Sequence, residues 1–160
     1  YAAYFGVCPQ SFPFKVGDQV HVVVNLSIYH SPNRDYVSLK VCAISRTNVK
    51  KDDIDSYEEY RRFCFALEDY SPESIRCSRD DAAVVYRKLR QNGTQLFWES
   101  ALSGNFGELN LGQIMAMIRV FVELGFVELR PDGRTPAPRV IPDAPKRDLS
   151  ESVVFRRIAK

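Results

Sequence analysis

The sequence predicts an α+β fold, because strand signals and helix signals occupy separate parts of the chain. Two stretches within the first fifty residues alternate apolar and polar side chains, the period-2 pattern of a half-buried antiparallel sheet. Residues 51–124 instead carry helix-capping signals and apolar residues at helical spacing. A strand–turn–strand pattern and a last helical stretch follow. With 160 residues, 45% of them hydrophobic, the chain can form one ordinary domain or two small ones.

The first two long strands are expected at residues 19–28 and 36–44, and residues 1–5 read as a further strand. Residues 29–35 are rich in turn formers, which predicts a long hairpin loop. One face of the hairpin should be buried and apolar: Val20, Val22, Val24, Leu26, Ile28, Val37, Leu39, Val41 and Ala43. The other face carries His21, Asn25, Ser27, Tyr36, Ser38 and Lys40.

Helix signals begin after residue 50. Ser56 and Glu59 have the spacing of a capping box, which predicts a helix from about Tyr57 to Leu67 that bridges two modules. Ser78 and Asp81 begin the next helix, and Asn110 with Gln113 begins a strongly apolar one that Gly125 closes. The later elements are expected at 79–92 (helix), 94–102 (helix), 111–124 (helix), 126–130 (strand), 139–141 (strand) and 150–159 (helix).

The order helix, helix, helix, β-hairpin, helix is winged-helix-like. The predicted organisation is therefore three segments. Residues 1–50 form a strand module, residues 51–70 form a linking helix, and residues 71–160 form a winged-helix-like domain.

Composition excludes several functional classes. The two histidines, His21 and His30, are too few for a histidine-rich metal or acid–base centre. The four cysteines form no C-x-x-C pair and lie among apolar neighbours, so we expect buried thiols in a reducing cytoplasm rather than zinc ligands or disulfides. No apolar run approaches the roughly 20 residues that span a bilayer. No spacing pairs a nucleophile with a base, so no catalytic residue is expected.

Charge differs along the chain although the total is only +2. Residues 1–50 contain five Lys or Arg and two Asp, a net +3, whereas residues 51–70 contain three basic and seven acidic residues, a net −4. Residues 71–160 contain fourteen basic and eleven acidic residues, a net +3. The acidic connector therefore masks a mildly basic strand module, which is compatible with phosphate binding and is also common in proteins that bind no nucleic acid.

Several segments resemble one family in the correct order. The segments FPFKVGD (12–18), VVVNL (22–26) and VSLKVCAI (37–44) look like the later strands of the OB domain of RecJ-type single-stranded-DNA exonucleases. The segments VFVELGFV (120–127) and KRDLSES (146–152), with Phe155, resemble the extra C-terminal domain that some RecJ proteins carry. Residues 80–89 resemble the helix that opens that domain.

The resemblance implies a non-catalytic accessory region of a bacterial cytoplasmic 5′-to-3′ exonuclease of DNA repair and recombination. The OB barrel would be truncated at its N-terminal side, since residues 1–5 look like its third strand. The family's catalytic core is a DHH phosphoesterase that holds two divalent metals, Mn or Mg, and this chain contains no D-H-H motif. No cofactor is therefore expected in this region. The implied partners are single-stranded DNA and single-stranded-DNA-binding protein, with no membrane.

The expected DNA-binding residues lie on or near the hairpin loop: Tyr29, His30, Arg34, Tyr36 and Lys40. OB folds stack bases on exposed aromatic side chains and follow the backbone with positive charge. The family's loop pattern, N-x-aromatic-x-Gly, is altered here, because Asn33 stands where Gly is usual. The alternative interpretation is that Tyr36 packs beneath the linking helix and that Arg34 is a solvated loop charge.

The apolar helix 111–124 is expected to be mostly core rather than a base-reading helix, although Gln113 and Arg119 are polar. Arg134 and Arg139 on the second hairpin are candidates for phosphate contact or plain surface. Phe97 and Trp98 are expected in the core, or in a docking pocket if they are exposed. The competing function is a protein–protein interaction module that does not contact DNA.

Overall fold

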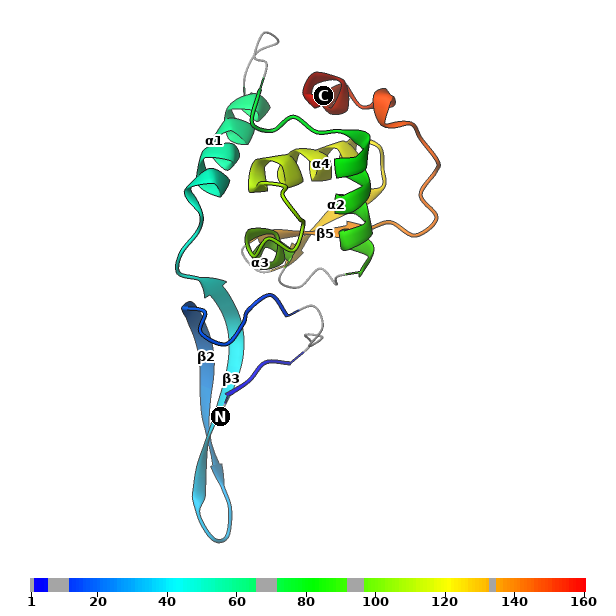
Figure 1. Cartoon of the computed structure of the whole chain (residues 1–160). Coiled ribbons are helices and arrows are strands. Elements are labelled where there is room, and N and C mark those ends of the chain that lie inside the picture. The colour runs from blue at the N-terminus through cyan, green and yellow to red at the C-terminus, as the bar shows by residue number, and fades with distance from the viewer. Residues whose placement is uncertain (1, 6–11, 66–71, 92–96, 133–134) are drawn as a thin grey trace. The chain divides into compact units, whose positions relative to one another are not determined.

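The computed structural model describes residues 2–5, 12–65, 72–91, 97–132 and 135–160. The chain divides into two compact units, residues 1–48 and residues 49–160, which are treated separately below. The first unit is a small β-sheet and the second contains the helices and a two-stranded sheet (Figure 1). The long strands thus precede the helices, and a smaller two-stranded sheet belongs to the helical unit, which is compatible with the predicted α+β class.

The first unit is built on a long β-hairpin. Strands β2 (Val20–His30) and β3 (Asp35–Arg46) pair antiparallel, and β1 (Ala2–Ala3) pairs parallel with β3, so the sheet order is β1-β3-β2. The predicted long loop at 29–35 is wrong, because Tyr29 pairs with Tyr36 and His30 pairs with Asp35. Residues 31–34 alone make the turn, which the Ser31 N–H closes by donating to the Arg34 carbonyl at 3.3 Å.

A β-bulge changes the faces of this hairpin. Val23 pairs with Ala43 but Val24 pairs with Val41, so Cys42 is the extra residue. Beyond the bulge, Ile44 is the partner of Val22 and takes the face that was predicted for Ala43. The predicted placement of Ala43 on the apolar face is therefore wrong, since strict alternation cannot anticipate an inserted residue.

The described part of the second unit contains eight further elements. Helix α1 (Lys51–Phe65) is followed by α2 (Arg79–Gln91), α3 (Phe97–Leu102) and α4 (Leu111–Glu123). Strands β4 (Val127–Asp132) and β5 (Thr135–Val140) pair antiparallel, and the short 3₁₀ helix η2 (Leu149–Glu151) leads into α5 (Val153–Ile158). Residues 66–67, 92 and 94–96 of the predicted helices lie outside the described residues.

Helix α4 is the centre of the core. Its apolar side chains pack with residues from the helices around it and from β4, and the largest fully buried members include Ile75, Val85, Phe97, Phe106, Ile114, Met117, Phe121, Val127 and Ile158. The predicted mostly-core role of this helix is confirmed. Its predicted caps are also present: Asn110 and Gln113 form a reciprocal capping box, and Gly125 adopts φ +75° after the last turn.

The start of α1 differs from the prediction. The helix begins at Lys51, so Ser56 lies inside it rather than at its N-cap. Ser56 and Asp53 are instead buried against the beginning of α4, where the Leu111 N–H donates to Asp53 Oδ1 at 2.9 Å and the Gly112 N–H donates to the Ser56 hydroxyl at 3.1 Å. Helix α1 thus packs on α4 and satisfies backbone donors that a helix N-terminus leaves free.

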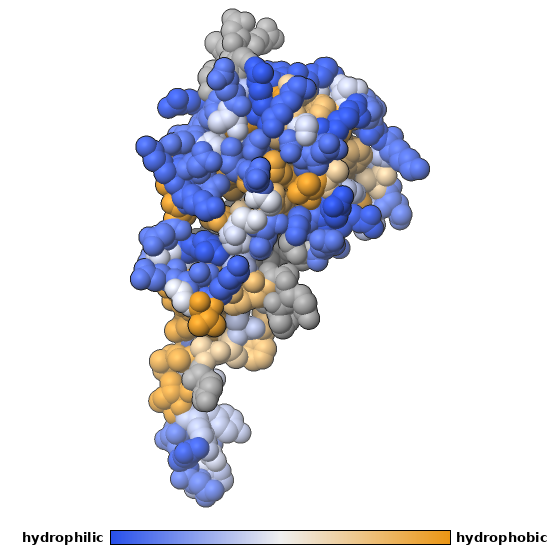
Figure 2. Space-filling model, in the orientation of Figure 1, coloured by the Kyte–Doolittle hydropathy of each residue, from blue (hydrophilic) through white to orange (hydrophobic). Residues whose placement is uncertain are grey.

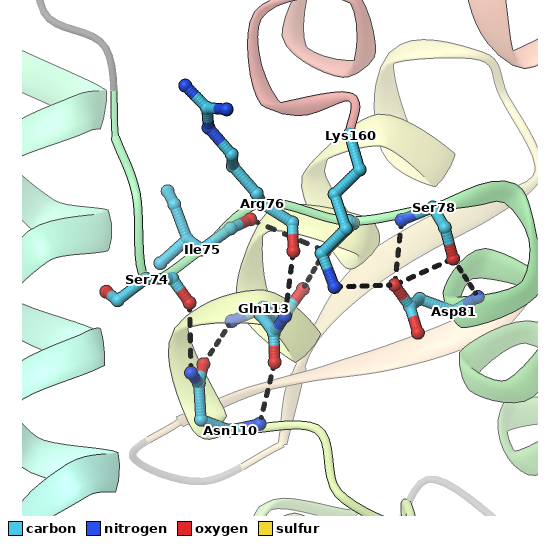
Figure 3. Close-up of polar contacts among 9 residues, drawn as sticks. Ser74, Ile75, Arg76, Ser78, Asp81, Asn110, Gln113 and Lys160 are labelled. Carbon is cyan, nitrogen blue, oxygen red and sulfur yellow. Dashed lines mark hydrogen bonds and ion pairs between the residues drawn. The ribbon is translucent and has the colours of Figure 1, made fainter.

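A polar network fixes residues 74–78 against α4 (Figure 3). The Asn110 amide donates to the Ser74 carbonyl at 3.0 Å, and the Gln113 amide donates to the Arg76 carbonyl at 2.7 Å. The predicted cap at Ser78 is present too, because its hydroxyl accepts from the Asp81 N–H at 3.1 Å. These contacts hold the segment before α2 in place and explain why Gln113, although polar, is buried.

Candidate nucleic-acid interface on the hairpin

The hairpin displays two different faces. Because side chains alternate along a strand and paired residues share a face, Tyr29, Tyr36 and Lys40 lie on one side, which we call the aromatic face. The other side, the apolar face, carries Val22, Val24, Leu26, Ile28, Val37 and Leu39. The sequence predicted DNA binding for the residues of the aromatic face and burial for those of the apolar face.

Two tyrosines stand directly opposite each other on the aromatic face. Tyr29 on β2 pairs with Tyr36 on β3, and their exposed fractions are 69% and 43%. The Arg34 guanidinium carbon lies 4.5 Å from the centroid of the Tyr36 ring, which is cation–π distance. The structure therefore brings three of the five predicted residues together beside the turn, Tyr29, Arg34 and Tyr36, and both tyrosine rings are accessible.

Lys40 extends the same face along β3. It is four residues from Tyr36, a separation of about 13 Å along a strand. Its ammonium nitrogen lies 5.8 Å from the centroid of the Phe5 ring. Phe5 is 66% exposed and was not among the predicted residues, because only the pairing of Ala3 with Lys40 brings this part of the chain onto the sheet.

His30 lies on the opposite face from the tyrosines. Its register places it with the apolar face, and its Nδ1 is 2.8 Å from Asp35 Oδ1 across the strand pair. The structure thus does not bring His30 together with Tyr29, Tyr36 and Lys40. Sequence alternation alone could have separated His30 from Tyr29, had the strand been extended to residue 30.

The apolar face is exposed rather than half-buried. Leu26 is 66% exposed, and Val22, Val24, Ile28 and Val37 are exposed as well. Figure 2 shows this hydrophobic surface along the hairpin, with hydrophilic residues at its tip. The predicted burial of this face is therefore wrong in the structure.

The polar residues of α4 have structural roles in the second unit. Gln113 is engaged in the network around Asn110, and Arg119 hydrogen-bonds with Tyr60 and Cys64. Burial raises the pKa of the Tyr60 hydroxyl, and its hydrogen bond to Cys64 raises it further. Gln113 is therefore buried, whereas Arg119 is exposed on α4 beside Tyr60 and Cys64.

Other predicted residues have mixed outcomes. Phe97 is buried and its ring meets Trp98 edge-on at 4.8 Å, while Trp98 itself is only partly buried. Arg139 is exposed on β5, and Arg134 lies outside the described residues.

The cysteines also differ from one another. Cys77 is buried and burial raises the pKa of its thiol to about 12, as expected for an inert core thiol. Cys64 is partly buried. Cys42, the bulge residue, is exposed, so the prediction of a buried thiol is wrong there, and Cys8 lies outside the described residues.

The described residues do not form a metal centre or a membrane span. Within these ranges, no three His, Cys, Asp or Glu side chains are grouped so that they could hold a metal ion. No helix among the described residues combines the length and the hydrophobicity needed to cross a bilayer.

Comparisons with protein-family models, with curated proteins and with solved structures found no match to this chain.

Proposed function

We propose that this chain is a non-catalytic accessory region of a RecJ-like 5′-to-3′ single-stranded-DNA exonuclease, and that its hairpin binds the single strand. The observation that carries this proposal is the exposed pair Tyr29–Tyr36 with the Arg34 guanidinium over the Tyr36 ring. Hydrolysis would belong to a separate DHH domain with its Mn or Mg ions. The proposed setting is the bacterial cytoplasm, with single-stranded-DNA-binding protein as a further partner.

The aromatic face has the two components that single-strand binding requires. Bases stack on exposed aromatic rings without sequence preference, each contributing about 1–3 kcal/mol, and Arg or Lys neutralises the phosphates. Tyr29, Tyr36 and Phe5 supply the rings, while Arg34 and Lys40 supply the charges. An OB-type sheet presents such residues in this way, and a winged-helix-like unit follows it in the proposed architecture.

Fluorescence anisotropy with a short labelled single strand tests the proposal. Tyr36→Ala should weaken binding by about 5- to 150-fold, the equivalent of one lost base stack. Arg34→Ala should weaken binding and reduce the slope of log K against log salt by about one. With one phosphate neutralised by each of Arg34 and Lys40, binding should fall roughly sevenfold between about 50 and 200 mM salt.

Arg130→Ala is the matched control, since Arg130 is exposed and paired to Glu128 on β4 at 2.6 Å, in the other unit. This variant should bind like the unmodified chain. Binding that is insensitive to salt and to Tyr36→Ala would contradict the proposal, and so would the absence of binding at low salt. Hydrolysis of the strand by this chain would contradict the non-catalytic role.

A protein-interaction module is the second candidate, because the helical unit contains an apolar pocket. The pocket has a volume of about 500 Å³, in the range of ligand sites. Helices α1, α3 and α4 and strand β4 contribute its lining, which includes Tyr57, Trp98, Leu102, Met115, Val122 and Leu129. Its partly buried Trp98 fits the expectation that an accessible tryptophan marks a docking pocket.

A further inference from the structure

A charged pocket of the helical unit is lined by residues of α1, α4 and α5. Its volume is about 310 Å³, at the lower end of the range for small-molecule sites. Arg119 and Glu123 of α4 and Arg157 of α5 line it, and we call it the two-arginine pocket. The remaining lining consists of Phe63, Cys64, Val153 and Val154. Two positive charges and one negative charge thus line a cavity of small-molecule size.

Both guanidinium groups are held by adjacent positions of α1. The Arg157 guanidinium carbon lies 4.6 Å from the centroid of the Phe63 ring, which is cation–π distance. The ring is only 3% exposed, so it gives Arg157 a fixed support. Arg119 hydrogen-bonds with Cys64, the next residue of α1, and with Tyr60, one turn earlier. The two cations are therefore positioned before any ligand arrives, which lowers the entropic cost of binding.

Glu123 is largely engaged by the start of α5. Its carboxylate accepts from the Ser152 hydroxyl at 2.5 Å and from the N–H groups of Val153 and Val154 at 2.8 and 3.2 Å. These donors compensate part of its negative charge, so the pocket remains favourable for an anion. A carboxylate has about four acceptor positions, and these three bonds leave one for a hydroxyl group of a ligand.

Arg119 has hydrogen-bonding capacity left for an anion. No carboxylate of a described residue lies within ion-pair distance of it, and its side chain is exposed. A guanidinium has five N–H donors, of which Tyr60 and Cys64 can accept only some. Two cations in one small pocket repel each other unless an anion lies between them. The planar fork of arginine matches the oxygens of a phosphate group.

We propose that the two-arginine pocket binds a small hydroxylated phosphate monoester, of the class of polyol phosphates. Arg119 and Arg157 hold the phosphate group, a ligand hydroxyl donates to Glu123, and the carbon chain lies against Val153 and Val154. The pocket is larger than a phosphate ion, which leaves room for an ester of a few carbon atoms. This site goes beyond the proposed DNA-binding function and lies in a different unit from the hairpin.

A phosphorus-31 NMR titration of glycerol 3-phosphate with the full chain tests this inference. The ester should bind with a Kd below about 1 mM. Arg119→Gln and Arg157→Gln should each weaken binding by about 10- to 150-fold, because each removes a charge-assisted hydrogen bond. Inorganic phosphate should bind about 2- to 10-fold more weakly than the ester, the equivalent of one lost hydrogen bond to Glu123.

Arg62→Gln is the matched control. Arg62 is exposed on α1 next to Phe63 and does not line the pocket, so this variant makes the same charge change and should bind like the unmodified chain. Circular dichroism melting of each variant separates loss of binding from loss of folding. Because Arg157 also packs on Phe63, Arg119→Gln alone provides the test if Arg157→Gln melts early.

The inference is overturned if the unmodified chain binds glycerol 3-phosphate more weakly than about 1 mM, or if folded arginine variants bind it as tightly as the unmodified chain. Inorganic phosphate that binds as tightly as the ester would overturn the assignment of an ester. Displacement of the ester by a single-stranded oligonucleotide would show that the pocket belongs to nucleic acid instead. Tyr36→Ala should leave ester binding unchanged, and Arg119→Gln should leave oligonucleotide binding unchanged. Failure of the hairpin proposal and failure of this one are therefore distinguishable.

Discussion

Helix α4 and strand β2 are both rich in apolar residues and have similar lengths, 13 and 11 residues, yet they bury them very differently. Eight residues of α4 are buried, whereas ten of the eleven in β2 are exposed. Helix α4 has neighbours on several sides, while among the described strands β3 alone pairs with β2 along its full length. Apolar sequence creates a core only where other elements cover it, and a lone hairpin becomes an accessible surface.

The largest expected effect compares one core residue with one surface residue. Phe121→Ala removes a ring that is 1% exposed and should cost about 3–5 kcal/mol of unfolding free energy. Leu26→Ala on the apolar face should change stability by no more than about 0.5 kcal/mol. Trp98 is the sole tryptophan of the sequence and lies in the helical unit, so its fluorescence during urea unfolding measures that unit.

A large shift of the Trp98 transition by Leu26→Ala would break this comparison, because it would require the apolar face of the hairpin to support the helical unit. Unchanged stability of Phe121→Ala would contradict the comparison as well, since α4 would then not be the centre of the core.

The next effect tests how closely α1 approaches α4. A Cβ at Gly112 would lie 2.3 Å from the Ser56 carbonyl oxygen and 2.7 Å from Ile75 Cγ2, which forces backbone to move. Gly112→Ala should therefore destabilise the helical unit by about 1–3 kcal/mol, although alanine normally favours helix. Gly107→Ala is an unsuitable control because of its φ of +72°. Ala83→Gly, at an exposed position of α2, serves instead, because it measures the ordinary helix preference for alanine over glycine, about 1 kcal/mol. Stabilisation by Gly112→Ala would show that the two helices are not in contact.

A smaller effect is expected at the N-cap of α4. Asn110→Ala removes the side chain that accepts from the Gln113 N–H at 2.9 Å and donates to the Ser74 carbonyl. The loss should be about 1 kcal/mol, the usual contribution of an N-cap. Asn110→Asp keeps the acceptor and should retain most of the stability. If the aspartate variant is as destabilised as the alanine variant, the donor to Ser74 matters more than the cap.

The smallest effect depends on pH. Although partial burial opposes it, hydrogen bonds from the Ser152 hydroxyl and from the Val153 and Val154 N–H groups lower the pKa of Glu123. A carboxylate with a lowered pKa stabilises the fold above its unfolded pKa, about 4.3, and this contribution is lost as pH falls through the lower folded value. Glu123→Gln should therefore melt at a lower temperature at pH 7, and the difference should shrink below about pH 4. A difference that is independent of pH would contradict this role.

The sequence predicted the local features of α4 well and the long-range features poorly. Asn110, Gln113 and Gly125 act through neighbouring backbone groups, so their spacing was sufficient to locate both ends of the helix. Ser56 showed the same spacing with Glu59 but serves a different helix. Its true partner, Gly112, is 56 positions away, and nothing in the local pattern of α1 indicates that contact.

The candidate site was also predicted only in part. Tyr29, Arg34, Tyr36 and Lys40 were identified by residue type, and Tyr29, Tyr36 and Lys40 do share a face. His30 was grouped with them because it is adjacent in sequence, but adjacency in a strand means opposite faces. Phe5 was missed because the pairing of β1 with β3 is a long-range contact.

The bulge at Cys42 has a consequence for how this hairpin can tolerate change. Side chains of a strand change sides with every residue, so one inserted or deleted position between Tyr36 and Cys42 would exchange the two faces on one side of the change. The bulge is already one inserted position, and it lies between the part of β3 that contains Tyr36 and Lys40 and the part that contains Ile44 and Arg46. Removing Cys42 would therefore make the ladder regular, leaving Ala43 opposite Val23 and Ile44 opposite Val22 without disturbing the tyrosine pair. The bulge thus divides the hairpin into two stretches of regular pairing, one between the turn and Val24 and one from Val23 to Val20. The side-chain alternation of each stretch can change without changing that of the other.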